Sequence, residues 1–242
     1  MVELTLPKRR DTVPTSPCAA CAVQDRVFCS ALDAPELERM GNLAHQISVP
    51  GRSTIIEEGE AAEWLFNVTA GIVKLYKLLP DGRQQVTGFL FAGDFLGIAL
   101  NETYAYSAEA IGAVQLCRFP RVGIEGLLGD LPHLEKRLLT MASNELVQAQ
   151  DQLLLLGRKT AREKVVSFLL NLSRRAENRG ESASPVNVPM SRDAIADYLG
   201  LTTETVSRTL TKLKTEGCIR LLAGNQIDLP DMEKLIDMSE GD

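Results

Sequence analysis

The sequence predicts an α+β protein with three parts: a β-rich unit, one long helix and a basic winged helix-turn-helix. Three observations predict this fold class. Glycines interrupt short runs of strand-forming residues from about 46 to 120. Glycine is then absent between Gly129 and Gly157, where apolar residues recur at helical spacing. The following third of the chain holds two short helical patterns joined by a glycine turn.

Length and composition exclude several other classes of protein. The 242 residues suffice for one large domain or two ordinary ones. With 45% hydrophobic and 24% charged residues, the composition is globular and not disordered. No apolar run approaches the roughly 18 residues of a membrane span, and the N-terminus has no secretion signal. We therefore expect a cytoplasmic protein with no membrane partner and with reduced cysteines.

Charge is divided unevenly along the chain. The formal net charge is -6, yet residues 157–222 carry 12 Lys and Arg against 7 Asp and Glu, and an acidic tail follows. Salt screens each charge beyond roughly 8–10 Å, so a local positive region attracts a polyanion even on an acidic protein. The same region is compatible with a solvated basic face. Charge alone therefore leaves nucleic acid as one of two interpretations.

The domains are predicted at these boundaries: a flexible arm and cysteine loop at 1–30, the β-rich unit at 31–134, the long helix at 135–157 and the winged helix-turn-helix at 158–242. Three prolines without apolar periodicity predict a disordered arm over residues 1–17. Asp33 and Pro35 predict the start of a short helix. Within the β-rich unit, Pro80-Asp81-Gly82 predicts a hairpin turn, because proline presets φ and glycine accepts positive φ.

The long helix carries an apolar seam. Side chains of leucine and alanine alternate at steps of three and four, at Leu139, Ala142, Leu146, Ala149, Leu153 and Leu156. This is a heptad pattern, and its small alanines let two helices approach closely. Spacing alone fits a helix packed on its own domain as well as a dimer seam. The position between a β domain and a basic domain favours a homodimer joined through these six residues.

The segment from Ser191 to Leu213 has the pattern of a helix-turn-helix. Ser191 caps a first helix, Gly200 ends it in a conformation that suits glycine, and Thr202 caps a second helix. Val206 and Leu210 give the second helix an inner face. The run that begins at Ile219 predicts a short hairpin that forms the wing.

The outer face of the second helix suits base recognition. We expect contacts to DNA from Thr202, Thr203, Glu204, Ser207, Arg208 and Lys212. The N-terminal end of a recognition helix meets base edges, where arginine binds guanine and glutamate accepts from cytosine. Lys212 lies further along and reaches phosphates. Glu204 and Arg208 also suit an i, i+4 surface pair worth about 0.2–0.5 kcal/mol, which does not exclude base reading.

Five cysteines in a reduced compartment indicate metal binding, redox chemistry or burial. Cys18, Cys21 and Cys29 lie within twelve residues of a polar segment, and Cys117 is distant. Four thiolates suit tetrahedral zinc or an iron–sulfur cluster, and the spacing does not separate the two. Cys218 lies at the turn into the wing, where an apolar residue fits, so we interpret it as core filler.

The chain resembles the CRP/FNR family of bacterial transcription regulators over about residues 18–235. Ile55-Ile-Glu-Glu-Gly-Glu, Leu65-Phe-Asn-Val-Thr-Ala-Gly-Ile-Val-Lys and Gly93-Asp-Phe-Leu-Gly are similar to its β-roll. Glu204-Thr-Val-Ser-Arg is similar to the recognition motif of the FNR branch. The resemblance implies a cyclic-nucleotide-binding-like β-roll, a homodimer with a central helix pair, and double-stranded palindromic DNA with TTGAT half-sites. It also implies contact with RNA polymerase through the hairpin at Asp81-Gly82.

Cyclic nucleotide is not expected as the signal. The family's nucleotide pocket needs an arginine followed by serine, and here Tyr106 precedes Ser107. A phosphate there would meet Glu102 and Glu109, which lie nearby in the sequence, and we expect no cation beside them, so the phosphate would be repelled. An enzyme is not expected either, because the two histidines lie in different segments without a nucleophile or carboxylate pattern.

The cysteine spacing C-x2-C-x7-C resembles a variant of the oxygen-sensing FNR branch, in which four cysteines hold a [4Fe–4S] cluster. The resemblance implies an oxygen- or redox-responsive regulator, an activator of genes for low-oxygen metabolism, whose cluster promotes pairing of the seam helices. The alternative is a zinc-stabilised or cluster-free regulator of the same family that senses another signal. Because no charge interrupts the seam at Ala149, we also expect a dimer that depends less on the cluster.

Overall fold

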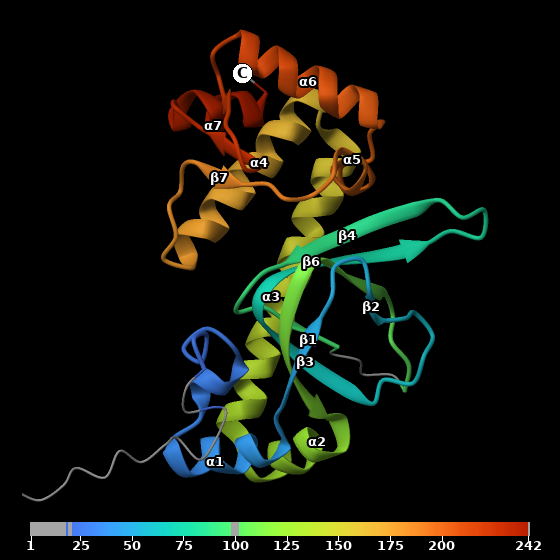
Figure 1. Ribbon diagram of the computed structural model, residues 1–242, viewed down its shortest axis with the longest axis vertical. Helices are drawn as coiled ribbons and strands as arrows, with labels where there is room; N and C mark the ends of the chain where they lie inside the picture. The colour runs from blue at the N-terminus through green and yellow to red at the C-terminus, as the bar shows by residue number, and fades with distance from the viewer. Residues whose placement is uncertain (1–17, 19–20, 98–101, 242) are drawn as a thin grey trace, which may run out of the picture.

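The computed structural model describes residues 18, 21–97 and 102–241 (Figure 1). A β-rich half, a long helix and a helical C-terminal half follow one another along the chain, which confirms the predicted α+β fold class. The arm predicted at residues 1–17 lies outside the described residues.

One antiparallel sheet forms the β-rich half. Its strands are β1 (His45–Val49), β2 (Thr54–Ile56), β3 (Trp64–Leu78), β4 (Gln84–Leu90), β5 (Phe95–Leu96) and β6 (Ser107–Pro120). Their order is β1-β6-β3-β4, with β2 paired to β6 and β5 paired to β3. The long strands β3 and β6 direct alternate side chains inward, so that Val68, Val73 and Leu116 are almost fully buried. The sheet is thus a roll around its own core.

The predicted hairpin turn joins β3 to β4. Gly82 has a φ of 85°, which glycine adopts without strain. The N–H of Leu79 donates to the carbonyl of Arg83 at 2.8 Å and closes the turn. The hairpin extends outward below the helices of the C-terminal half (Figure 1).

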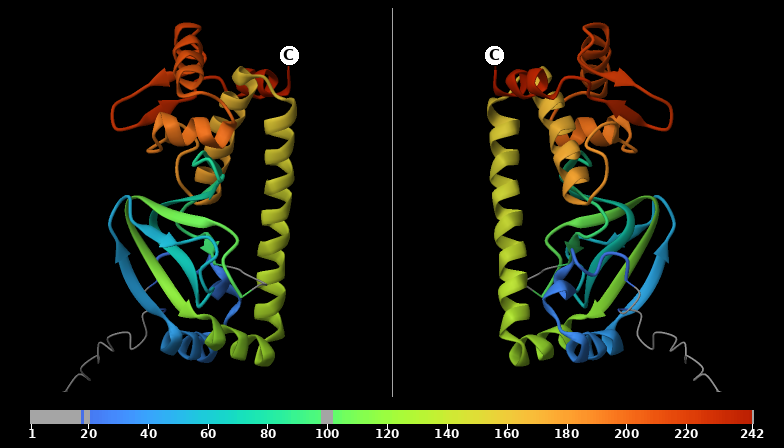
Figure 2. Two further views of the ribbon diagram at one scale, coloured as in Figure 1. Left: turned by 90° about the vertical axis from the view of Figure 1, so that its right-hand side faces the viewer. Right: turned by 90° about the vertical axis from the view of Figure 1, so that its left-hand side faces the viewer.

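Among the described residues, three α-helices flank the roll, and a short 3-10 helix (Phe28–Ala31) packs beside it. α1 (Ala34–Leu43) begins as predicted at Asp33, which forms a reciprocal capping box with Glu36. α2 (Arg121–Asp130) was not predicted, and it follows directly on β6. α3 (Pro132–Arg158) is the predicted long helix, and it runs the length of the molecule along one flank (Figure 2). It therefore connects the two halves.

The C-terminal half is a winged helix-turn-helix. Its elements are α4 (Ala161–Asn178), β7 (Val186–Asn187), α5 (Arg192–Leu199), α6 (Thr203–Thr215), β8 (Arg220–Leu221), β9 (Gln226–Asp228) and α7 (Met232–Glu240). β8 and β9 form the predicted wing, and β7 adds a third strand to it. The helix α7 was not predicted, and it packs on α4 through buried Leu235 and Met238.

The two halves share one hydrophobic core. Val86, Phe89 and Phe91, at and just after β4, belong to the same buried cluster as the inner faces of α4, α5 and α6. Gln85 of β4 donates to the carbonyl of Asp197 near the end of α5, at 2.6 Å.

None of the helices in the described part of the chain combines the length and the apolar character that a membrane span requires.

Candidate functional site

The helix α6 is held in place by caps and by an apolar inner face. The side chain of Thr202 accepts a hydrogen bond from the N–H of Thr205 at 3.1 Å, which caps its N-terminus. Gly200 ends α5 with a left-handed φ of 60°, as the sequence predicts. Val206 and Leu210 are buried against the rest of the helical core. The opposite face of α6 is therefore left on the surface.

The predicted DNA-contacting residues all lie exposed on this surface: Thr202, Thr203, Glu204, Ser207, Arg208 and Lys212. The Arg208 guanidinium lies 3.7 Å from the Glu204 carboxylate, and both side chains are more than 70% exposed. A surface pair of this kind contributes little free energy, so Arg208 can leave Glu204 at little cost to bind another group. Lys212 lies 4.0 Å from Glu216, which also binds Arg162 at 2.7 Å.

The predicted seam of α3 faces outward. Leu139, Leu146 and Leu153 are 70%, 61% and 70% exposed. Figure 2 shows that no other described helix or strand covers the outward flank of α3. Ala142 and Ala149 lie between the leucines at the predicted steps. A row of exposed leucines is unfavourable in water, so this flank offers a surface for a second helix.

Leu156, the last residue of the predicted seam, is placed differently. It is half-buried, and its Cδ2 lies 3.2 Å from the point that a Cβ on Gly200 would occupy. Leu156 thus contacts the turn of the helix-turn-helix in its own chain. The heptad spacing did not distinguish it from the outward leucines, because it lies where α3 reaches the C-terminal half.

The cysteine loop is anchored by a phenylalanine that the sequence analysis did not single out. Phe28 is fully buried, with its ring centroid 5.0 Å from that of Phe95 and 5.3 Å from that of Phe119. Leu134 of α3 belongs to the same apolar cluster. The loop therefore docks between β5, β6 and the first turns of α3, and Phe28 fixes the position of the adjacent Cys29.

The anchored loop places three cysteines near Cys117 of β6. Cys18, Cys29 and Cys117 are buried in one apolar cluster, and half-buried Cys21 packs against it. Burial, and then the neighbouring thiols, raise the pKa of Cys29, and the same causes raise the pKa of Cys117 to about 12. Packing in this one cluster brings the four thiols into the same neighbourhood. At neutral pH Cys29 and Cys117 are protonated, so they must release protons when they bind a metal.

One polar side chain reaches into the cysteine cluster. Asn67 of β3 is 2% exposed, pairs in register with Cys117, and donates its Nδ2 hydrogen to Sγ of Cys29 over 3.7 Å. Its Oδ1 is buried without a hydrogen-bond partner among the described residues. Asn67 was not predicted from the sequence, although a single amide within the apolar run Leu65-Phe-Asn-Val was a usable signal.

The donor set fits a sulfur-ligated inorganic group. Four soft thiolates suit zinc or an iron–sulfur cluster, and the amide of Asn67 can donate to a bound sulfur. In the described part of the chain, no three Cys, His, Asp or Glu side chains are arranged to hold a metal ion as they stand. Binding such a group therefore requires the loop to adjust against β6. Cys218 belongs to the core of the C-terminal half and is 1% exposed, as expected of core filler.

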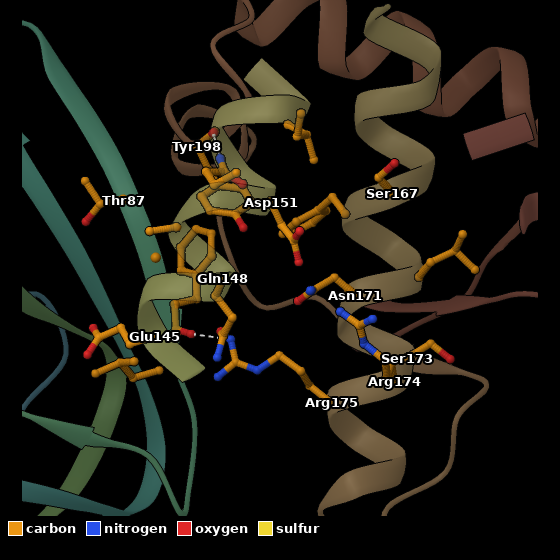
Figure 3. A pocket seen from close by; sticks show the side chains of 18 of the residues that line it. Thr87, Glu145, Gln148, Asp151, Ser167, Asn171, Ser173, Arg174, Arg175 and Tyr198 are labelled. Carbon is orange, nitrogen blue, oxygen red and sulfur yellow. Dashed lines mark hydrogen bonds between the residues drawn. The ribbon is translucent and has the colours of Figure 1, made fainter. Parts of the chain in front are cut away.

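A cavity of about 740 Å³ lies between α3, α4 and β4. In Figure 3, Glu145 and Gln148 of α3 face Arg175 and Asn171 of α4 across this space. Polar side chains from both helices thus line the gap between the long helix and the C-terminal half, with Thr87 of β4 on its other side.

Tyr106 lines the same cavity. Its hydroxyl accepts the N–H of Gly97 at 3.0 Å, and burial raises its pKa to about 12. The expectation that no cation lies near Glu109 is wrong, because Lys74 of the facing strand β3 binds Glu109 at 3.3 Å. Cross-strand pairing decided this contact, and residues near Glu109 in the sequence could not reveal it. The expectation that cyclic nucleotide does not bind stays a prediction.

A β-roll joined by a long helix to a winged helix-turn-helix with an exposed recognition face defines a DNA-binding transcription regulator. Two family descriptions match the chain: "Cyclic nucleotide-binding domain" over residues 46–130 and "Crp-like helix-turn-helix domain" over residues 163–238. The chain belongs to the CRP/FNR family of transcription regulators, which bind DNA and act as dimers.

Relatives along most of the chain support this assignment. The chain is 43% identical to the nitrogen fixation regulation protein FixK of Bradyrhizobium diazoefficiens, over 86% of this chain and 87% of the relative. It is 36% identical to the transcriptional activator protein FnrL of Cereibacter sphaeroides, over 93% of this chain and 92% of the relative. The solved structure of FixK2 from Bradyrhizobium japonicum superposes with a TM-score of 0.76 at 38% identity, covering 81% of this chain and 96% of that one. These relatives are regulators and not enzymes, which confirms the expectation for this chain.

Proposed function

We propose that this CRP/FNR regulator is an oxygen- or redox-responsive activator that holds a [4Fe–4S] cluster through Cys18, Cys21, Cys29 and Cys117. The observation that carries the proposal is the convergence of three loop cysteines with a cysteine on a distant strand in one buried cluster. Four soft sulfur donors gathered at one place are the donor set that a sulfur-ligated inorganic group needs.

The chemistry of the donors supports the same proposal. When bound, a [4Fe–4S] cluster supplies an inorganic group that reacts with oxygen. The protein's part is to present the four sulfurs, to exclude water through the apolar surroundings of Phe28, and to donate a hydrogen bond from Asn67. Genes for low-oxygen metabolism are the proposed targets.

The proposed output is DNA binding by a homodimer. The outward leucines of α3 would pair two subunits, and the paired α6 helices would read a palindrome of TTGAT half-sites. Bases would be contacted by Arg208, Glu204 and Ser207, and the phosphate backbone of the DNA would be bound by Thr202, Thr203 and Lys212. The β3–β4 hairpin, whose tip is exposed, is the proposed contact with RNA polymerase. A regulator of this kind works in the cytoplasm, where its thiols stay reduced.

Metal analysis of anaerobically purified protein tests the proposal. We expect about four iron and four sulfide per subunit and a visible absorption that bleaches in air. Cys117→Ser should lose the iron and the absorption. Cys218→Ser is the matched control, since it replaces a buried cysteine outside the cluster and should keep both.

Two other results would contradict the proposal. Stoichiometric zinc without sulfide would favour the zinc-stabilised alternative, which the same four thiols suit. A colourless, metal-free protein that binds its operator at full strength under anaerobic conditions would favour a cluster-free regulator.

A further inference from the structure

The cysteine loop also contacts the C-terminal half directly, through Arg26. This residue lies between Cys21 and Cys29, and its Nη1 donates to the carbonyl of Arg179 at 3.0 Å. Arg179 is the C-cap residue of α4, so the bond reaches the end of the first helix of the DNA-binding half. Loop and α4 are 153 residues apart in the chain, and only the tertiary structure brings them together.

The position of Arg26 is fixed from two further sides. Its backbone carbonyl accepts a hydrogen bond from Nη2 of Arg137, on α3, at 3.2 Å. Its Cβ lies 3.2 Å from the point that a Cβ on Gly93 would occupy, so the turn between β4 and β5 approaches it closely. Arg26 therefore touches the roll, the long helix and the DNA-binding half at once.

The end of α4 is seated on the same turn of the roll. Arg175 forms an ion pair with Asp94 and donates to the carbonyl of Phe89 at 2.8 Å. The guanidinium groups of Arg175 and Arg179 lie 4.6 and 4.5 Å from the centre of the Phe91 ring. The bond from Arg26 to Arg179 thus adds the cysteine loop to an existing contact between the two halves.

We propose that Arg26 couples the conformation of the cysteine loop to the position of the DNA-binding half within a single subunit. This inference rests on the proposed function, since the ligand of the loop is the group held by the four cysteines. The coupling acts in addition to pairing of the α3 helices between subunits.

Arg26 lies in the chain between two of the proposed cluster ligands. Arg26 lies three residues before Cys29 and five after Cys21, so a loop that closes its thiols on an inorganic group also moves the intervening backbone. The hydrogen bond from Arg26 to the carbonyl of Arg179 forms only when the Arg26 side chain lies within reach of the end of α4. The loop with a bound group and the loop without one therefore differ in how firmly they hold α4. A difference of this kind is what makes binding at one site change binding at another.

The first test needs no metal. Amide hydrogen exchange over residues 176–181 is measured in metal-free protein, wild type against Arg26→Ala, with Arg39→Ala as a control. Arg39 is an exposed arginine on α1 that pairs with Asp130, so its removal changes the net charge equally. We expect faster exchange at 176–181 in Arg26→Ala alone. Unchanged exchange would overturn the inference, whether or not the protein carries iron.

The second test measures the coupling itself. The operator affinity of anaerobically loaded protein is divided by the operator affinity of the metal-free protein, for wild type, Arg26→Ala and Arg39→Ala. We expect this ratio to fall by about tenfold, toward one, in Arg26→Ala only, with iron content and sedimentation unchanged. An unchanged ratio at normal iron content would overturn the inference and leave the proposed function intact. Absence of iron from the wild type would instead contradict the proposed function. The hydrogen-exchange experiment alone would then test the contact between Arg26 and Arg179.

Discussion

The side-chain amide of Asn67 donates to Sγ of Cys29 over 3.7 Å, while its own Oδ1 is buried without a partner among the described residues. A buried amide with one unpaired oxygen costs free energy, and we propose that Asn67 is kept because it donates to the sulfur ligands of the proposed group. Donation to sulfur favours the thiolate form that binds metal, and it lowers the pKa of Cys29 against the larger effect of burial.

Asn67→Asp should weaken metal retention. It places a carboxylate beside the thiolates and removes the donor, and loss of such an outer contact costs about 10–100-fold in metal affinity. Iron released to a chelator under anaerobic conditions is the measurement. Asn144→Asp, on the exposed surface of α3, is the control for the added charge. Equal iron release from both variants would mean that Asn67 has no part in holding the group.

Arg208→Ala should weaken binding to a palindromic TTGAT duplex by about 1–3 kcal/mol, because the variant loses a base contact. Fluorescence anisotropy with that duplex and with a scrambled duplex measures the effect. Lys212→Ala should instead weaken binding to both duplexes and reduce the salt dependence, as loss of a phosphate contact does. Specific binding that survives Arg208→Ala unchanged would show that another residue reads the bases.

Leu146→Glu should disrupt the dimer. The change puts a charge at the middle of the outward seam, and loss of a buried leucine contact costs about 2–5 kcal/mol. Sedimentation of the purified protein at micromolar concentration gives the measurement. Asn144→Glu adds the same charge on an exposed position of the same helix outside the seam and should leave the dimer intact. If both variants stay dimeric, the subunits pair elsewhere.

The metal-free wild-type protein should remain a dimer in the same experiment. The outward leucines Leu139, Leu146 and Leu153 and the alanines between them carry no charge, so no repulsion among them opposes pairing. A strictly monomeric metal-free form would show that the cluster is required for pairing.

The stability of the metal-free protein should fall as the pH rises above about 8.5. The folded state raises the pKa of Cys29 and that of Cys117, the latter to about 12, so the folded chain keeps these protons while the unfolded chain releases them. The stabilisation is complete below the unfolded pKa and is lost as the pH climbs toward the folded one. Urea unfolding of reduced protein between pH 7 and pH 10 measures this, and Cys117→Ser should show a shallower decline.

The sequence alone determined the α+β class, the hairpin at Gly82, the long helix and the helix-turn-helix. These are local features: caps at Ser191 and Thr202, a left-handed Gly200 and an uninterrupted heptad each act through residues a few positions apart. The surface set on α6 could be predicted for the same reason, since helical periodicity alone separates its inner from its outer face.

The tertiary structure decided what depends on residues far apart. Packing of Phe28 against Phe95 and Phe119 placed the cysteine loop on β6, and strand register set Asn67 beside Cys117. No local pattern encodes either contact. The bond from Arg26 to Arg179 and the inward position of Leu156 likewise depend on how the two halves dock. The docking itself depends on the apolar area buried between the halves, which no local pattern contains.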